Sequence, residues 1–349
     1  MKFRKKDEMK VVIDHKIPYI DEAIRRIADE VVFLPGHDFT KEVVKDADAL
    51  IVRTRTRCNR ELLEGSQVKF IATATIGYDH IDTEYCKEAG IIWTNCPGCN
   101  AGSVEQYVHS VLLLLKREKG LDLKNATIGV VGVGHVGSKV ARMAEGLGMK
   151  VLLNDPPRAD KGEQGFVDLE TIARECDVIT FHTPLNREGK YATYHMVEEE
   201  FLFSLKRTPY IINSSRGEVV DTASLLAALS AGKVKDAIID TWEYEPRISR
   251  ELLSVTYLGT PHIAGYSADG KANATRMSLE ALCRFYDIHE EFCISLPELS
   301  KEEFPDDRDE AQLQAYNPKS DSERLKSAPD KFEWFRGNYP VRRELNGEF

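Results

Sequence analysis

Three polar side chains that could do chemistry together, Arg216, Glu245 and His262, lie in the second half of the chain. Each follows an apolar run of the kind that forms a buried strand in a parallel sheet. The loops that leave the carboxyl ends of such strands line the ligand crevice of an open α/β sheet. We therefore expect a cation, a carboxylate and an imidazole to meet at one crevice. The apolar runs in question are residues 210–212, 237–239 and 255–258.

These three side chains suit the handling of a proton and an anion. An imidazole titrates near neutral pH, which makes His262 the natural base for the proton of a hydroxyl group. Glu245 could hydrogen-bond the other ring nitrogen and fix its tautomer, and Arg216 can fork onto a carboxylate or carbonyl. Each residue alone has a structural alternative: a surface ion pair, an ordinary loop acid or a buried histidine. Their succession at three strand ends favours the catalytic interpretation.

A glycine-rich turn upstream of this set has the pattern Gly-x-Gly-x-x-Gly. Residues 127–131 before it read as a strand and residues 138–147 after it read as a helix, which is the context that a dinucleotide-binding turn requires. The glycines allow a tight bend, close approach of a pyrophosphate and close packing of helix on strand. The helix N-terminus adds free N–H groups for the phosphates. The residues of this predicted cofactor loop are Gly132, Gly134, His135, Val136 and Gly137.

An acidic residue, Asp155, ends the apolar run after this turn. A carboxylate at that position accepts hydrogen bonds from the adenosine ribose and repels a 2′-phosphate, so the sequence predicts NAD rather than NADP. The hydroxyl residues Thr183, Ser214 and Ser215 stand at further strand ends, where they can contact the nicotinamide ribose. A nicotinamide beside a base and a cation suits hydride transfer from a carbon that bears a hydroxyl group.

Composition limits the other possibilities. The 349 residues can form two domains and a smaller appendage, and a net charge of −10 argues against a nucleic-acid surface. We find no run of eighteen apolar residues, so we expect no membrane span. Seven cysteines without regular spacing suggest reduced thiols in a cytoplasmic protein. Cys96 and Cys99 lack further ligands of metal-site spacing, so we interpret them as part of a turn before a helix and expect no bound metal.

The alternation of strands and helices predicts an α/β fold with two Rossmann-like parallel-sheet domains. We expect a substrate domain of residues 1–100 and 267–289, an NAD-binding domain of residues 101–266, and a small C-terminal dimerisation element of residues 290–349. Long helices over 101–119 and 267–286 connect the domains. The aromatic residues of the tail could anchor an interface, so we expect a homodimer. The remaining predicted strands are residues 10–13, 31–34, 49–52, 70–72, 91–93, 150–154 and 178–181, and a further helix is predicted over 18–28.

Over about residues 10–285 the chain resembles the D-isomer-specific 2-hydroxyacid dehydrogenases. Within that family it is similar to a subgroup that oxidises a phosphorylated four-carbon 2-hydroxy acid on the route to pyridoxal 5′-phosphate. The segments that carry the family resemblance are the glycine loop with Asp155 and residues 215–217, 240–246 and 261–262; those that carry the subgroup are residues 73–82, 97–101, 155–160 and 262–266.

The resemblance implies a role for each matched residue. Arg216 and Glu245 match the family's catalytic arginine and glutamate, and His262 matches its proton donor. The implied cofactor contacts are Asp155, Thr183, Ser214, Ser215, Arg216, Asp240 and Gly265, and the implied substrate contacts are Thr54, Thr75 and Tyr266. The subgroup also carries a C-terminal dimerisation unit, although residues 295–349 are short for it.

A phosphorylated substrate needs compensating positive charge. Arg53, Arg55 and Arg57 alternate after the predicted strand 49–52 and would share a face if the chain stayed extended. Our hypothesis is that Arg53 faces the phosphate; the alternative is a solvated rim of charge.

Two other functions stay open at this stage. One is a dehydrogenase for another 2-hydroxy acid, such as phosphoglycerate or glycerate. The other is an NAD-sensing binding protein without catalysis, which would not need the arginine, the carboxylate and the base.

Overall fold

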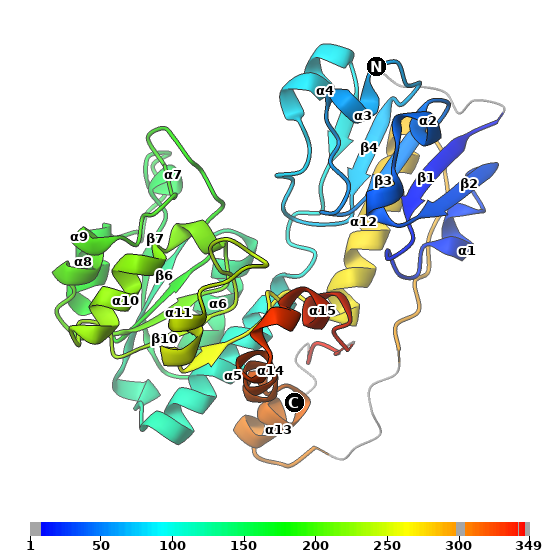
Figure 1. Ribbon diagram of the computed structural model, residues 1–349. Helices are drawn as coiled ribbons and strands as arrows, with labels where there is room; N and C mark the ends of the chain where they lie inside the picture. The colour runs from blue at the N-terminus through cyan, green and yellow to red at the C-terminus, as the bar shows by residue number, and fades with distance from the viewer. Residues whose placement is uncertain (1–7, 298–303, 341, 346–349) are drawn as a thin grey trace. The chain divides into compact units, whose positions relative to one another are not determined.

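The computed structural model describes residues 8–297, 304–340 and 342–345. The chain divides into two compact units, coloured mainly blue and green in Figure 1. The first unit holds the described residues up to Asn100 together with those from Ser267 to Pro297. The second holds Ala101–Tyr266 together with the described residues from Phe304 onward. None of the helices in the described ranges is long and apolar enough to span a membrane.

The first unit is built on a five-stranded parallel sheet in the order β2-β1-β3-β4-β5. The apolar residues of its central strands β1, β3 and β4 are buried on both faces, as expected where helices cover a parallel sheet. The long helix α12 (Ala268–Tyr286) belongs to this unit and packs Leu279 and Leu282 into one of the two clusters. The other elements are β1 (Lys10–Asp14), α1 (Asp21–Ile24), β2 (Glu30–Leu34), η1 (Gly36–Asp38), α2 (Lys41–Val44), β3 (Ala49–Val52), α3 (Arg60–Leu63), β4 (Phe70–Thr73), α4 (Thr83–Ala89) and β5 (Ile92–Thr94).

One helix prediction in this unit is too long. The helix expected over 18–28 is only α1, Asp21–Ile24. Tyr19 has a left-handed backbone (φ 62°), which keeps the helix from beginning earlier. After Ile24 the hydrogen bonds tighten to three-residue spacing, with the N–H of Arg26 on the carbonyl of Ala23.

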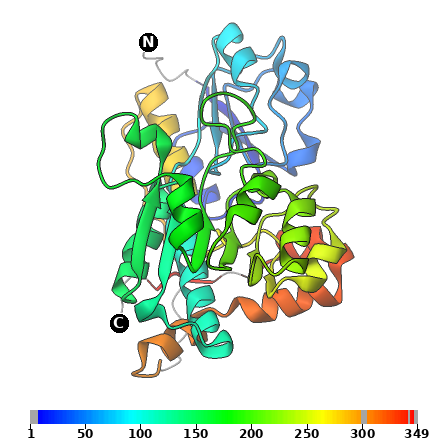
Figure 2. The same cartoon turned by 90° about the vertical axis from the view of Figure 1, so that its left-hand side faces the viewer.

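The second unit is built on a six-stranded parallel sheet in the order β11-β10-β9-β8-β6-β7. Alternate residues of one strand enter different clusters: Tyr210 and Ile212 pack with helices α5 and α6, whereas Ile211 packs with α8 to α11. Helices therefore lie on both sides of the sheet (Figures 1 and 2). The elements are α5 (Ala101–Lys119), η2 (Leu123–Asn125), β6 (Thr127–Val131), α6 (His135–Gly146), β7 (Lys150–Asn154), α7 (Pro156–Ala159), α8 (Leu169–Glu175), β8 (Val178–Phe181), α9 (Glu199–Ser204), β9 (Tyr210–Asn213), η3 (Gly217–Val219), α10 (Thr222–Ser230), β10 (Asp236–Ile239), α11 (Arg250–Val255) and β11 (Leu258–Gly259).

The strand predicted over 255–258 is wrong for its first three residues. Val255 is the last residue of helix α11, and β11 begins only at Leu258. Ser249 caps the helix, since its hydroxyl accepts a hydrogen bond from the Leu252 N–H at 3.1 Å. The apolar run therefore combines a helix end with a short edge strand, which periodicity cannot separate in so few residues.

The C-terminal segment, by which we mean residues 304–340 and 342–345, packs on the second unit. Its helices α13 (Arg308–Ala315) and α14 (Pro318–Ser327) contact α5, and α14 also contacts the edge strand β11 (Figure 1). The Gly259 N–H donates to the Ser322 hydroxyl at 2.9 Å, so a side chain satisfies a donor of the edge strand. After η4 (Pro329–Lys331) follows α15 (Phe332–Gly337). Phe332 is buried, whereas Trp334 is 56% exposed.

Candidate active site

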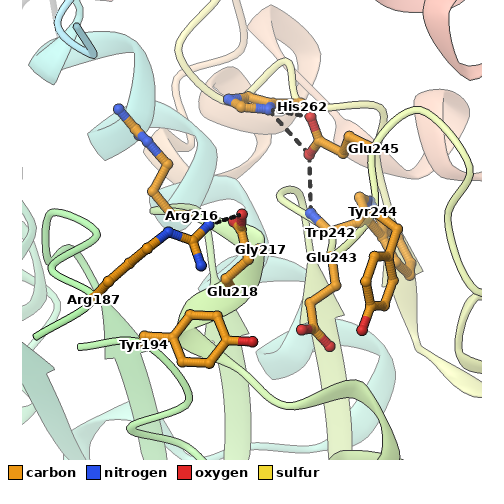
Figure 3. A pocket seen from close by; sticks show the side chains of 10 residues that line it. All are labelled: Arg187, Tyr194, Arg216, Gly217, Glu218, Trp242, Glu243, Tyr244, Glu245 and His262. Carbon is orange, nitrogen blue, oxygen red and sulfur yellow. Dashed lines mark hydrogen bonds and ion pairs between the residues drawn. The ribbon is translucent and has the colours of Figure 1, made fainter. Parts of the chain in front are cut away.

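The carboxyl ends of β9, β10 and β11 deliver three predicted residues to one pocket of about 390 Å³ (Figure 3). Arg216 follows β9, Glu245 follows β10 and His262 follows β11. Neighbouring parallel strands end at the same sheet edge, and this explains why residues distant in sequence share the pocket. We did not propose the remaining lining residues as site residues from the sequence, although most lie in the same loops: Arg187, Tyr194, Gly217, Glu218, Trp242, Glu243 and Tyr244.

Glu245 and His262 form a close pair. Nδ1 of His262 lies 2.8 Å from Oε2 and 3.1 Å from Oε1 of Glu245. The N–H of Trp242 donates to Oε1 at 2.9 Å, so the carboxylate is held by its own loop as well. Because Nδ1 is used in this way, Nε2 is the ring nitrogen that remains for a substrate proton.

The surroundings keep Glu245 ionised. Burial opposes the charged form, but the His262 imidazole, the Arg336 guanidinium and the Trp242 N–H outweigh burial and hold the pKa of the carboxyl below its ordinary value of 4.5. An ionised carboxylate beside an imidazole stabilises the imidazolium that forms when the ring accepts a proton.

Asp240 fixes the loop that carries His262. Its side chain is 1% exposed and accepts hydrogen bonds from the Thr260 hydroxyl at 2.7 Å and from the N–H groups of Ile263 and Ala264 at 2.8 and 3.0 Å. Burial raises the pKa of this carboxyl. His262 itself has a left-handed backbone (φ 57°), a conformation that the surrounding bonds must hold in place.

The loop of Arg216 lies directly against the loop of Glu245. A Cβ atom on Gly217 would stand 1.9 Å from the carbonyl oxygen of Trp242, so no larger residue allows this approach. Asn213, which we did not propose as a site residue from the sequence, organises the turn: its amide donates to the Arg216 carbonyl at 2.9 Å and its oxygen accepts from the Ser215 hydroxyl at 2.8 Å. The guanidinium of Arg216 donates to the Ser215 carbonyl at 2.8 Å.

The glycine-rich turn fits a dinucleotide. A Cβ atom on Gly137 would lie 2.0 Å from the carbonyl oxygen of Gly132, whereas a Cβ atom on Gly134 would meet no atom within 4 Å, which leaves room for a pyrophosphate. Helix α6 begins at His135, three residues before the predicted start, so His135 and Val136 form its first turn. That turn contains no acidic side chain, and its N–H groups can bind phosphate.

Two buried hydroxyls and one carboxylate complete the candidate cofactor site. Oγ1 of Thr183 and Oγ of Ser214 follow the neighbouring strands β8 and β9 and have no hydrogen-bond partner within the described residues. Buried polar atoms are rarely left unpaired, so these two fit a ligand that would satisfy them. Asp155 follows β7 and accepts the Val133 N–H at 2.8 Å, which places its carboxylate at the glycine turn. Gly265 lies one residue beyond the backbone N–H groups that bind Asp240.

The candidate substrate residues lie in both units. Arg53 and Thr54 follow β3, and Thr75 follows the neighbouring strand β4, so these three stand at one edge of the first sheet. The Thr75 hydroxyl lies 2.6 Å from that of Thr73. Tyr266 belongs to the second unit, where its ring meets the Tyr339 ring edge-on at 6.1 Å.

Residues 53–57 do not stay extended, which was the condition for the three arginines to share a face. The strand ends at Val52 and the chain turns at once, with the Thr56 N–H donating to the Arg53 carbonyl at 3.1 Å. Arg53, Arg55 and Arg57 therefore do not alternate along one strand. The turn replaces the strand because buried Thr56 donates its hydroxyl to the Gly36 carbonyl at 3.0 Å.

One cluster among the described residues has the composition of a metal site: His195, Asp221 and Glu243 offer ligand atoms within 4.8 Å of one another. Its oxygens already have hydrogen-bond partners. Glu243 binds the His195 ring at 2.7 Å and the Thr222 N–H at 2.8 Å, and Asp221 caps helix α10 through the Ser224 N–H at 2.8 Å. We therefore interpret this cluster as a structural network.

Comparison with known proteins places the site in a family. The family model described as D-isomer specific 2-hydroxyacid dehydrogenase, NAD binding domain, matches residues 104–264. Among solved structures, the D-lactate dehydrogenase of Aquifex aeolicus with NAD and lactic acid has a TM-score of 0.67 and 27% identity, covering 79% of this chain and 95% of that one. The NAD-bound 3-phosphoglycerate dehydrogenase of Entamoeba histolytica has a TM-score of 0.67 and 29% identity, covering 80% and 96%.

More similar relatives cover almost the whole chain. The erythronate-4-phosphate dehydrogenase of Bacteroides thetaiotaomicron is 60% identical over 338 residues, which are 96% of this chain and 97% of that protein. The protein of the same name from Porphyromonas gingivalis is 41% identical over 347 residues, or 97% and 94%. The chain therefore belongs to the D-isomer-specific 2-hydroxyacid dehydrogenase family. It is an NAD-dependent enzyme, which confirms the predicted cofactor. The two predicted parallel-sheet domains are confirmed as well.

Proposed function

We propose that this enzyme oxidises 4-phospho-D-erythronate to 2-oxo-3-hydroxy-4-phosphobutanoate, on the route to pyridoxal 5′-phosphate. The observation that carries the proposal is the Glu245–His262 pair at 2.8 Å, in one pocket with Arg216. That arrangement supports oxidation of a 2-hydroxy acid. The choice among such acids is supported by the high identity to proteins named for erythronate 4-phosphate.

Each catalytic residue has one task in this reaction. NAD, when bound, supplies the acceptor for the hydride from C2. Nε2 of His262 takes the proton of the C2 hydroxyl, and Glu245 stabilises the resulting imidazolium through Nδ1. Arg216 forks onto the substrate carboxylate and polarises the carbonyl that forms at C2.

Binding of the two ligands is assigned to two further sets of residues. We assign the substrate to Arg53, Thr54, Thr75 and Tyr266, with Arg53 on the phosphate. We assign NAD to Gly132, Gly134, His135, Val136, Gly137, Asp155, Thr183, Ser214, Ser215, Arg216, Asp240 and Gly265. Thr183 and Ser214 carry the buried hydroxyls described above, and this supports their assignment.

The proposal includes a cytoplasmic homodimer that associates through the C-terminal segment. Trp334, exposed at the surface of this segment, is the aromatic side chain that supports such an interface. Light scattering on the full chain should give twice the chain mass, and Trp334→Ala should lower it. A monomer, or a variant of unchanged mass, would count against the segment's role in association.

The substrate is tested by following formation of the 2-oxo acid product from 4-phosphoerythronate, 3-phosphoglycerate and D-glycerate, each with NAD and with and without 2-oxoglutarate. We expect 4-phosphoerythronate to have the highest kcat/KM, and a requirement for the oxo acid would show that NADH stays bound and is recycled. Turnover of another acid alone would overturn the substrate assignment. NAD binding without any turnover would favour a sensor.

A further inference from the structure

The C-terminal segment brings two guanidinium groups, one half-buried and one buried, to the loops that carry Glu245 and His262. Arg336 belongs to α15, and Arg342 lies beyond the end of that helix. Both side chains are largely withdrawn from solvent, at 16% exposure for the Arg336 side chain and 8% for Arg342. A buried arginine is costly unless it is paired, so the partners of each group indicate what it does.

Arg336 faces the catalytic carboxylate. Its Nη1 lies 3.5 Å from Oε2 of Glu245, the same oxygen that lies 2.8 Å from Nδ1 of His262. Tyr266, a candidate substrate residue, is a second partner. The Nε group of Arg336 is buried and has no hydrogen-bond partner within the described residues. The guanidinium thus contacts two residues of the site, and its Nε–H group is left as a hydrogen-bond donor without an acceptor among the described residues.

Arg342 holds the backbone just after His262. Its guanidinium donates to the carbonyl of Ile263 at 3.2 Å and to that of Ala264 at 2.6 Å. Asp240 accepts the N–H groups of the same two residues. The backbone after His262 is therefore held from two sides. The carboxylate of Asp240 binds its N–H groups, and the guanidinium of Arg342 binds its carbonyl groups. The Tyr316 ring, 3.9 Å from the Arg342 guanidinium, keeps that side chain in place.

We propose that the C-terminal segment is part of the catalytic apparatus, with Arg336 as a positioning residue that sets the charge balance of the Glu245–His262 pair and Arg342 as the clamp of the His262 loop. The expected effect of Arg336 on turnover rests on the proposed function, whereas its expected effect on the protonation of the His262 imidazole does not. In this arrangement the segment acts within its own chain, whatever its part in association.

The sign of the effect follows from the charges around the pair. Glu245 and Asp240 bring negative charge to His262, and Arg336 brings positive charge to Glu245. Tyr266 adjoins Arg336, and the pocket contributes two arginines and two carboxylates from the loops after β8, β9 and β10: Arg187, Arg216, Glu218 and Glu243. Removal of one positive charge from this set stabilises the imidazolium, so the ring should hold its proton to a higher pH.

The test compares Arg336→Gln and Arg336→Lys with the unaltered enzyme. Arg324→Gln is the matched control, since Arg324 lies in the same segment but stacks on the Phe335 ring at 5.2 Å. The first readout is the pH titration of the His262 ring by NMR on isotope-labelled histidine, assigned by loss of the signal in His262→Gln. The second is the pH profile of kcat/KM. Circular dichroism verifies that each variant is folded.

For Arg336→Gln we expect the ring titration and the acidic limb of kcat/KM to move upward together by about one pH unit, since the charge that is lost adjoins the carboxylate that holds the ring. We expect kcat to fall about tenfold or more, with KM for NAD within about twofold. In Arg336→Lys the His262 ring should titrate close to its pH in the unaltered enzyme, and in Arg324→Gln it should titrate at the same pH as in the unaltered enzyme. A ring titration that stays in place in Arg336→Gln would overturn the proposal, as would a shift seen only where the molecular mass also changes.

Discussion

The carboxylate of Glu245 lies 2.8 Å from Nδ1 of His262, although the two residues come from loops that follow different strands, β10 and β11. Four chemical groups hold the two residues in this contact. Asp240 binds the backbone after His262, the Trp242 N–H binds Glu245, and the C-terminal segment adds a guanidinium to each side. All of these contacts lie within the second unit.

Glu245→Gln should lower stability in a pH-dependent way. The folded protein holds the pKa of this carboxyl below 4.5, so the ionised form stabilises the fold above that pH and the contribution is lost as the pH falls through the lowered value. We expect a deficit of about 2 kcal/mol at pH 7 that narrows below pH 4.5, measured by urea unfolding. Glu251→Gln, at an exposed position of α11, should show no such gap. A deficit independent of pH would contradict this assignment.

Asp155→Asn should weaken the choice of NAD over NADP. The amide keeps an oxygen for only one of the Val133 and Arg158 N–H groups, which bind different oxygens of Asp155, and it removes the charge that repels a 2′-phosphate. We expect the ratio of kcat/KM for the two cofactors to fall by about tenfold. Asp168→Asn is the control, because Asp168 caps α8 in the same manner, accepting the Thr171 N–H at 2.7 Å. An unchanged ratio would remove Asp155 from the ribose site.

Gly217→Ala should separate the loops of Arg216 and Glu245. The added methyl group would lie 1.9 Å from the Trp242 carbonyl oxygen, so one loop must move. We expect about 1–3 kcal/mol of lost stability and a larger loss in kcat than in NAD affinity. Gly146→Ala adds a methyl group near the end of α6 with no atom within 4 Å and should leave both quantities near their original values. Full activity in Gly217→Ala would show that the contact is not needed.

Arg53→Ala should raise KM for the phosphorylated substrate by about tenfold or more, since a charge-assisted hydrogen bond to phosphate is lost. Steady-state assays with 4-phosphoerythronate and with erythronate separate the phosphate from the rest of the substrate. The variant should affect only the phosphorylated acid, and Arg57→Ala serves as the neighbouring control. An unchanged KM would favour the alternative that Arg53 belongs to a solvated rim of charge.

The sequence predicted the strands and the Glu245–His262 pair more reliably than the helix ends and the tail. Buried parallel strands are continuous apolar runs, and the residues that follow them are placed by topology. The boundary between α11 and β11 was predicted wrongly. Val255 is the last residue of the helix, but it is apolar and stands close to the apolar residues of the strand, so the sequence shows one continuous run. Arg336 was not foreseen because its partner Glu245 lies 91 positions away and the tail has no apolar period to position it.

The most direct test of the account is a single-turnover measurement with 4-phosphoerythronate deuterated at C2. The unaltered enzyme should transfer the deuterium to NAD, and a primary isotope effect should appear on that step. His262→Gln should bind NAD with unchanged affinity and transfer the label at least about a hundredfold more slowly, with Glu245→Gln intermediate. Transfer by His262→Gln at the rate of the unaltered enzyme would contradict the central claim that this histidine accepts the proton.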